Sequence, residues 1–136
     1  MDLINPPELG QPRGWTNGVV APAGSRMLFV AGQTAADGAG RITASDFAGQ
    51  FDAALAKTLT VVRAAGGTPH DVVSMTIYVS DLDAYRAARP AIKDMWRARL
   101  GTHYPAMALV EVCRLLDEGA LVEIEAVAAL PDAPRK

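Results

Sequence analysis

Two segments with helical periodicity separate the strand-like runs of this chain, and they limit how those runs can pair. The first is the clearer of the two, because apolar residues recur every three or four positions along it. Ser45 is a residue type that caps helices, and Asp46 places a favourable charge in the first turn. Gly66 and Gly67 end the pattern, so a helix is predicted between about residues 46 and 65.

The second helical segment covers residues 81–100 and is followed by Gly101. Pro90 lies inside it, and a proline in a helix interior removes a hydrogen bond. We therefore expect a short turn over residues 82–85 and a main helix from about Ala87 or Pro90. Connections as long as these two segments can join parallel strands, and such crossovers are nearly always right-handed. Both helices should then cover the same face of one sheet.

The strand-like runs occur in the order β-β-α-β-α-β-β once the two helices are included. They are Thr16–Val20, Met27–Ala31, Val72–Val79, Pro105–Cys113 and Leu121–Leu130. The first two are expected to form a hairpin through a Pro- and Gly-containing turn, and the last two an antiparallel hairpin. Residues 1–14, rich in proline and glycine, predict an irregular N-terminal arm. At 136 residues the chain suits one α+β domain, residues 1–136, with a single mixed sheet.

Alternation along the last two strands predicts a second buried face. Between Pro105 and Cys113 the small residues and valines should pack on the helices, and Met107, Leu109 and Glu111 should face the other way. Glu123 and Glu125 should share that outer face. Apolar side chains mixed with a few carboxylates are typical of a subunit interface. The pattern therefore predicts a homo-oligomer, although periodicity does not give its stoichiometry.

Composition argues against several kinds of partner. The formal charge is −2, and the basic residues form no continuous stripe, so neither nucleic acid nor an anionic membrane is an expected partner. The single cysteine, Cys113, permits no internal disulfide or cysteine-based zinc site, and it is expected to be a small buried hydrophobe. The first residues do not read as a signal peptide, and no apolar run approaches the roughly 20 residues of a membrane span. A cytoplasmic location is expected.

Short motifs in a fixed order resemble the Rid family of reactive-intermediate (enamine/imine) deaminases, also called YjgF-like. They are Gly14-Trp15-Thr16, Phe29–Gln33, the helix with Phe47 and Gln50, Ala64–Gly67, Ile77–Leu82, Pro105-Ala106 and Val122–Ala126. The resemblance covers nearly the whole chain. It implies a chorismate-mutase-like α+β fold with two helices on one face of a mixed sheet. It also implies a homotrimer that binds a small molecule in clefts between subunits, without a metal or organic cofactor.

The resemblance assigns a role to one residue on each of the last two strands. Glu123 matches the glutamate that positions or activates water, and it is the candidate catalytic residue. Met107 stands where enzymatic members carry an arginine that holds the substrate carboxylate. A thioether has neither a charge nor a donor, so it cannot make that bidentate pair. The expected 2-aminoacrylate deaminase activity is therefore weak or absent.

Further candidate substrate-binding residues come from the same comparison of motifs. Trp15 and Thr16 match the stretch that supplies an aromatic ring and a hydroxyl, and Gly32 matches a backbone donor. Ala31 stands where a serine is common, and Leu109 where a cysteine often sits.

Several alternatives stay open at the level of sequence. Glu123 can be a general acid/base with a pKa raised by burial, or a structural carboxylate across an interface. Glu111 and Glu125 are expected to be structural, paired with Arg114 or with another subunit, and His103 precedes the key strand closely enough to be a second base. The protein can be an enamine or imine hydrolase, or a non-catalytic small-molecule sensor or carrier on the same trimer. Ribonuclease activity is disfavoured because the chain has no basic stripe, no aromatic stacking platform and an acidic balance. Chorismate mutase activity is disfavoured because the two key strands supply no cations to hold a dicarboxylate.

Overall fold

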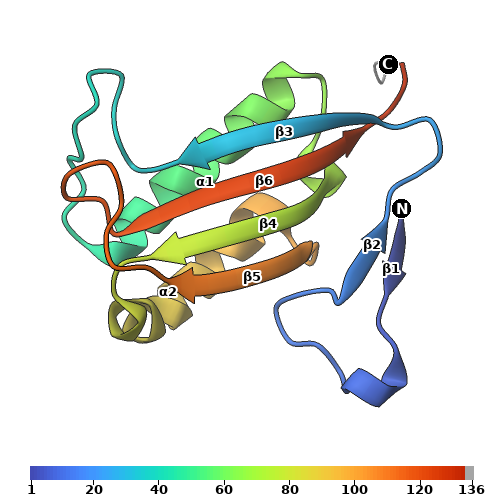
Figure 1. Ribbon diagram of the computed structural model, residues 1–136, viewed down its shortest axis with the longest axis horizontal. Helices are drawn as coiled ribbons and strands as arrows, with labels where there is room; N and C mark the ends of the chain where they lie inside the picture. The colour runs from blue at the N-terminus through green and yellow to red at the C-terminus, as the bar shows by residue number, and fades with distance from the viewer. Residues whose placement is uncertain (134–136) are drawn as a thin grey trace.

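Both long helices lie on one face of a four-stranded mixed sheet (Figure 1). The computed structural model describes residues 1–133. In the sheet the strands lie in the order β3-β6-β4-β5, so β3 and β5 form its edges. The strands are β3 (Arg26–Gln33), β4 (Val72–Val79), β5 (Ala106–Glu111) and β6 (Val122–Leu130), and the helices are α1 (Phe47–Ala64) and α2 (Leu82–Leu100). A 3₁₀ turn, η2 (Pro69–Asp71), precedes β4.

The predicted parallel crossovers are confirmed. β6 runs antiparallel to both β3 and β4, so β3 and β4 are parallel to each other and α1 connects them. α2 connects β4 to β5, which pair in parallel. The α+β class and the placement of both helices on one face are therefore correct. Neither long helix within residues 1–133 is apolar enough to cross a membrane.

The core lies between the helices and the sheet. Phe51 and Leu55 of α1, Trp96 of α2, and Val79 and Ile124 of the sheet are all buried there. α1 begins with a cap from Asp46, whose carboxylate accepts a hydrogen bond of 3.0 Å from the backbone N–H of Gly49. The sequence favoured Ser45 for this role, but the aspartate one residue later supplies the acceptor.

α2 is one continuous helix, and the expected break at Pro90 is wrong. Asp81 caps it by accepting a hydrogen bond from the N–H of Ala84, and Gly101, with φ of 61°, ends it as predicted. Pro90 lies on the exposed side of α2, where water can bind the backbone carbonyl that the missing N–H leaves free. Burial of Ile92 and Trp96 on the opposite side holds the helix on the sheet.

The first predicted hairpin is also wrong. A turn does form at residues 22–25, where the N–H of Ser25 donates to the carbonyl of Pro22. However, the strand before this turn, β2 (Gly18–Val20), pairs with β1 (Asp2–Ile4) in a separate two-stranded sheet. The arm predicted to be irregular therefore contains β1 and a 3₁₀ turn, η1 (Pro7–Leu9). β3 pairs with β6 instead, because only the main sheet buries Val30 against α1.

β5 and β6 do not form the expected closing hairpin, because β4 lies between them. The loop of residues 112–121 carries the chain past the end of β4, and β6 enters the centre of the sheet. Alternate residues of β6, from Val122 to Ala128, are almost fully buried against the helices. A central position gives this apolar strand two hydrogen-bonded neighbours, whereas a hairpin at the edge would give it one.

The faces predicted for β5 are inverted. β5 pairs with β4 so that Met107 lies beside Met75 and Leu109 beside Ile77. Met75 and Ile77 are buried under the helices, so Met107 and Leu109 face the helices too and pack on the core. Their bulk fills the space near α2, which small side chains would leave empty. The predicted faces of β6 are correct, since Val122 and Ile124 are buried there.

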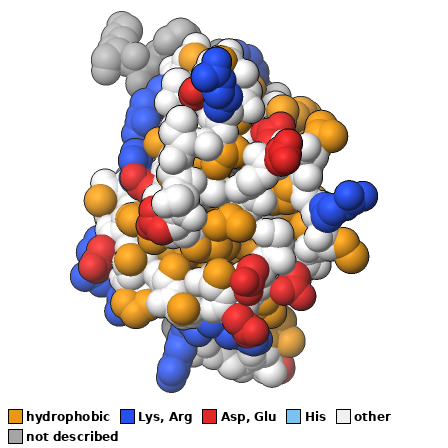
Figure 2. Space-filling model, turned by 90° about the vertical axis from the view of Figure 1, so that its left-hand side faces the viewer, with side chains coloured by type: hydrophobic (Ala, Val, Ile, Leu, Met, Phe, Trp, Pro, Cys, Tyr) orange, Lys and Arg blue, Asp and Glu red, His pale blue; other side chains and the backbone are white. Residues whose placement is uncertain are grey.

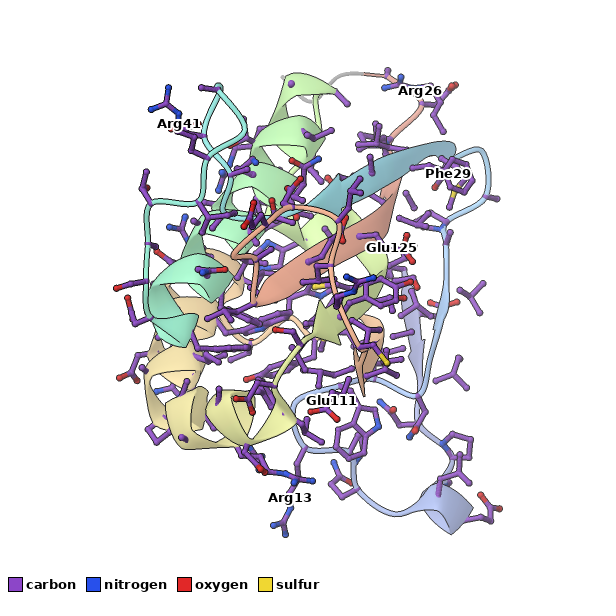
Figure 3. The ribbon with its side chains drawn as sticks, turned by 60° about the vertical axis from the view of Figure 1, so that its left-hand side comes forward. Arg13, Arg26, Phe29, Arg41, Glu111 and Glu125 are labelled. Atoms are coloured by element: carbon purple, nitrogen blue, oxygen red, sulfur yellow. The ribbon has the colours of Figure 1, made fainter. Side chains whose placement is uncertain are left out.

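The face of the sheet away from the helices, here called the open face, mixes apolar and acidic side chains. Phe29 is 77% exposed, and Met27 and Val110 also reach the solvent. Figure 3 shows Phe29 and Glu125 projecting from the sheet on the side opposite the helices. Hydrophobic side chains also reach the surface at the end of the sheet where β6 begins (Figure 2); Leu116, in the loop before β6, is 97% exposed.

Candidate functional site

A groove of about 980 Å³ lies between the edge strand β5 and helix α2. Its floor is apolar, and residues from α1, β4, β5 and α2 form it. They are Phe51, Ile77, Ile92, Trp96, Met107 and Leu109. Two tyrosines, Tyr85 and Tyr104, complete the walls, and the Tyr104 ring stacks on Trp96 with centroids 5.8 Å apart. The rim carries Arg13, Arg86, Arg89 and Lys93.

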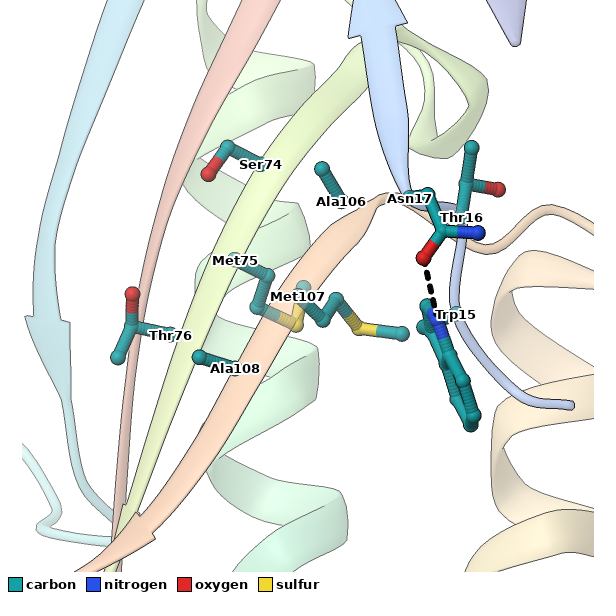
Figure 4. Close-up of a pocket in the computed structure, with 9 residues that line it drawn as sticks. All are labelled: Trp15, Thr16, Asn17, Ser74, Met75, Thr76, Ala106, Met107 and Ala108. Carbon is teal, nitrogen blue, oxygen red and sulfur yellow. Dashed lines mark hydrogen bonds between the residues drawn. The ribbon is translucent and has the colours of Figure 1, made fainter. Parts of the chain in front are cut away.

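A smaller pocket of about 350 Å³ adjoins this groove (Figure 4). Both cavities are lined by Trp15, Met107 and Ala108. Figure 4 shows the Met107 side chain extending toward the indole of Trp15. The aromatic residue and the methionine that the family motifs singled out are therefore brought together, at the edge of the sheet.

Trp15 is held in place by the N-terminal arm. Its indole N–H donates to the side-chain oxygen of Asn17 over 3.2 Å. Asn17 in turn donates both its backbone N–H and its side-chain amide to the Oδ1 of Asn5, over 2.8 and 3.2 Å. The next residue along from Trp15, Thr16, is buried, and its N–H donates to the carbonyl of Pro105. Sequence reasoning missed Asn5 and Asn17, because only the pairing of β1 with β2 brings them together.

Gly32 and Glu123 form a second group, on the open face. A Cβ built on Gly32 would overlap the Glu123 carboxylate, so a side chain at position 32 would displace that group. Glu123 is half-buried, and its carboxylate accepts no hydrogen bond from any residue in the described range 1–133. Ala31 is exposed beside Gly32. The carboxylate is therefore free to bind water or a ligand.

The two other carboxylates of these strands have structural partners within the chain. Glu125 accepts a hydrogen bond of 2.7 Å from the hydroxyl of Tyr78. This bond raises the pKa of Tyr78, and desolvation and the charges of Glu125 and Glu123 add to the increase. Glu111 accepts a hydrogen bond of 2.9 Å from the N–H of Leu82, at the start of α2. Arg114 pairs with neither carboxylate among the described residues.

Met107 and Glu123 lie on opposite faces of the sheet, so the expectation that they face one side is wrong. Met107 is beside Met75, whereas Glu123 is beside Tyr78, whose side chain points to the open face. The pleat of the sheet separates the two side chains, and the inversion of β5 described above is the cause. Glu123 lines neither of the two cavities described above.

Neither His103 nor Cys113 belongs to these cavities. The Nε2 of His103 lies 2.7 Å from the carbonyl of Val72, and its ring is near that of His70, with centroids 5.5 Å apart. Cys113 is exposed, contrary to the prediction of a buried thiol, because it follows the end of β5. In the described part of the chain, His, Cys, Asp and Glu side chains form no group of three suited to holding a metal ion.

Comparison with known proteins identifies the family. The sequence profile of the family described as Endoribonuclease L-PSP matches residues 13–130. The chain is a member of this family, which includes the Rid and YjgF-like proteins. A RutC family protein of Pyrococcus horikoshii is 32% identical over 103 residues, which cover 75% of this chain and 78% of the relative. The 2-iminobutanoate/2-iminopropanoate deaminase of Salmonella typhimurium is 30% identical over 102 residues, with 75% and 78% coverage.

The fold of this Rid protein is shared with solved structures of the family. A conserved Rid family protein of unknown function from Yersinia pestis superimposes with a TM-score of 0.82 and 32% sequence identity. The match covers 95% of this chain and 98% of that protein. The resemblance deduced from the short motifs is therefore confirmed at the level of family and fold.

Proposed function

We propose that this Rid protein hydrolyses a small enamine or imine in a cleft formed between two subunits of a homotrimer. One subunit supplies the edge of β5 with Trp15 and Met107, and its neighbour supplies the open face with Gly32 and Glu123. The observation that carries this proposal is the placement of these two groups on opposite faces of one sheet. The name of the Salmonella relative supports the reaction class.

The open face has the character of an interface in such an assembly. Phe29, Met27 and Val110 expose large apolar surfaces there, and a monomer would leave these in contact with water. Burying them against a neighbouring copy brings the open face of one subunit toward an edge of the next. The free carboxylate of Glu123 would then face the groove of the adjoining chain.

The chemistry requires only proton transfer and a placed water molecule. An enamine first gains a proton at carbon and loses one from nitrogen, which converts it to the tautomeric imine, and water then adds to the carbon of the C=N bond. The resulting carbinolamine loses ammonia and leaves a carbonyl compound, so that R₂C=NH and H₂O give R₂C=O and NH₃. Glu123 can accept the proton of the attacking water and return it to the departing nitrogen. The N–H of Gly32 is the proposed donor to the substrate.

Met107 excludes the usual way of holding a small carboxylate at this position. A charge-assisted hydrogen bond to a carboxylate contributes about 1.5–3 kcal/mol, and methionine provides none. We therefore expect weak or no turnover of 2-aminoacrylate. The test is to compare freshly generated 2-aminoacrylate with uncharged imines, using purified wild type and Glu123→Gln. Rapid turnover of 2-aminoacrylate by the wild type would contradict the assignment of Met107.

A non-catalytic binding protein is the second candidate function. It is favoured by apolar residues at three positions, Ala31, Met107 and Leu109, where enzymatic relatives carry polar groups by the resemblance above. The two functions differ in their response to Glu123→Gln. An enzyme loses turnover but keeps ligand binding, whereas a binding protein shows no turnover of any imine before or after the change.

A further inference from the structure

We propose that the groove between β5 and α2 binds a carboxylate with a body of aromatic size, and that cations of α2 hold the carboxylate in place of the missing arginine. As a statement about the substrate, this inference rests on the function proposed above. As a statement about binding, it depends only on the groove. The relevant cations are Arg86, Arg89 and Lys93 on α2, with Arg13 on the N-terminal arm.

These cations are brought to one place by helical geometry. Arg86, Arg89 and Lys93 are three, four and seven residues apart, so they lie along one side of α2. Arg13 reaches the same groove from the residues that precede Trp15. No aspartate or glutamate is among the residues that line the groove. In a chain with a formal charge of −2, all the charged side chains at this groove are therefore cationic.

Most of the cations have no acidic partner. Among residues 1–133, Arg13, Arg89 and Lys93 form no ion pair, and Arg86 makes only a long contact of 3.6 Å with Asp83, with both side chains exposed. Arg99, farther along α2, differs: its guanidinium binds both oxygens of Asp52, over 2.6 and 3.0 Å. The charges beside the groove remain available for an anion, whereas that of Arg99 is used to join the helices.

The floor of the groove indicates the rest of the ligand. Six apolar or aromatic side chains form it, and its volume of about 980 Å³ lies at the upper end of small-molecule sites. A three-carbon imino acid would leave most of the apolar floor in contact with water. An aromatic body would cover Met107 and Leu109, where sulfur and methyl groups make favourable contacts with rings. We expect the carboxylate of such a ligand to lie at Arg89 and Lys93 on the rim.

The test measures binding of three probes to the wild-type protein by isothermal titration calorimetry. They are 3-phenylpropanoate, its uncharged analogue 3-phenylpropanamide, and the small anion propanoate. We expect 3-phenylpropanoate to bind at least about tenfold more tightly than either control, with an affinity that falls as salt is added. Equal binding of the acid and the amide would overturn the proposal, because the cations would then contribute nothing.

The matching variants are Arg89→Ala/Lys93→Ala and, as a control, Arg97→Ala. Arg97 is exposed on the same helix but does not line the groove. The double variant should lose at least about tenfold in affinity for 3-phenylpropanoate, and the control should bind as the wild type does. Both should keep the wild-type melting temperature, since all three side chains are exposed. An unchanged affinity in the double variant, or an equal loss in the control, would refute the role of these cations.

Turnover measurements separate this inference from the proposed reaction. If 3-phenylpropanoate binds as expected but no imine is hydrolysed, the groove is assigned and the reaction is wrong. If uncharged imines are hydrolysed but 3-phenylpropanoate does not bind, the reaction holds and the anion site is wrong. Phenyl phosphate serves as a further probe. If it binds more tightly than 3-phenylpropanoate, the proposal of a carboxylate ligand is wrong and the groove is assigned to a phosphate ester.

Discussion

The carboxylate of Glu123 rests against the backbone of Gly32, in the space that any side chain at position 32 would need. Glycine is thus required at this point of β3 for the carboxylate of β6 to lie where it does. The two residues are on neighbouring strands, since β3 pairs directly with β6. The position of the Glu123 carboxylate, the candidate catalytic group, therefore depends on the absence of a side chain at Gly32.

Replacing Gly32 by alanine should therefore impair turnover more than stability. The new Cβ meets the far end of a flexible glutamate, which can rotate away at a cost of less than about 1 kcal/mol. The displaced carboxylate would no longer hold water, so imine hydrolysis should fall at least about tenfold. Urea unfolding and steady-state rates measure the two effects. In the double variant Gly32→Ala/Glu123→Gln, the loss should equal that of Glu123→Gln alone; additive losses would show that Gly32 acts independently.

Replacing Met107 by arginine should create activity toward 2-aminoacrylate. The side chain at 107 extends toward Trp15 beside the groove, so a guanidinium there can meet a small carboxylate. A bidentate pair should raise kcat/KM at least about tenfold. Met107→Leu, which keeps the volume without the charge, is the control. If the arginine variant folds and gains nothing over the leucine variant, other residues of the cleft have also diverged.

Changing Phe29 to aspartate should dissociate the proposed trimer. Phe29 is the most exposed aromatic side chain of the open face, and a charge there would be buried on assembly. Light scattering after size-exclusion chromatography should give a trimer for the wild type and a smaller species for the variant. Leu116→Asp is the control, because Leu116 is even more exposed than Phe29 but lies in the loop before β6. A wild-type protein that is monomeric at micromolar concentration would contradict the interface, and the shared cleft with it.

Stability should depend on pH through the pair formed by Asp52 of α1 and Arg99 of α2. The hydrogen bonds from Arg99 lower the pKa of Asp52 below its ordinary value of 3.8, and burial opposes this only in part. A carboxyl whose pKa is lower in the folded state adds stability above pH 3.8, and this contribution disappears as the pH falls through the folded pKa. Arg99→Ala should cost about 1 kcal/mol in urea unfolding at pH 7, with a smaller difference near pH 2.

The ion pair of Arg86 with Asp83 provides the comparison for that experiment. Both of its side chains are exposed and the contact is long, so Arg86→Ala should leave the unfolding free energy nearly unchanged at either pH. An Arg99→Ala variant as stable as the wild type at pH 7 would show that the two helices are held together by apolar packing alone.

The elements of this fold were predictable from sequence, but the pairing of its strands was not. Periodicity found α1, α2 and the strands β2 to β6, because each needs its own apolar pattern to be buried. Periodicity did not reveal that β6 lies between β3 and β4. The apolar face of β6 would be buried equally well if β6 paired with β5 at the edge of the sheet. The inversion of β5 has the same origin. Alternation separates Met107 from Ala108, but only the register with β4 decides which of them faces the helices.

The candidate site was predictable only in part. Glu123 and Gly32 were both identified, and the structure brings them into contact. The separation of Met107 from Glu123 depends on β5 and could not be read from motif order. The basic residues were described from sequence as forming no continuous stripe, and Asp83 and Asp94 are indeed interspersed with the cations of α2 along the chain. Neither aspartate lines the groove, and only Asp83 contacts one of its cations, Arg86, over 3.6 Å.

The hydrogen bonds that join Asn5 to Asn17 give the first few residues an influence far from their own position. They hold the indole of Trp15 through the β1–β2 pair, which is separate from the main sheet. A change in residues 1–5 can therefore alter one wall of the pocket without disturbing the core. Relatives that differ in their first residues can thus differ in ligand preference while sharing every strand of the sheet. Removing residues 1–5 should loosen the tryptophan without unfolding the domain.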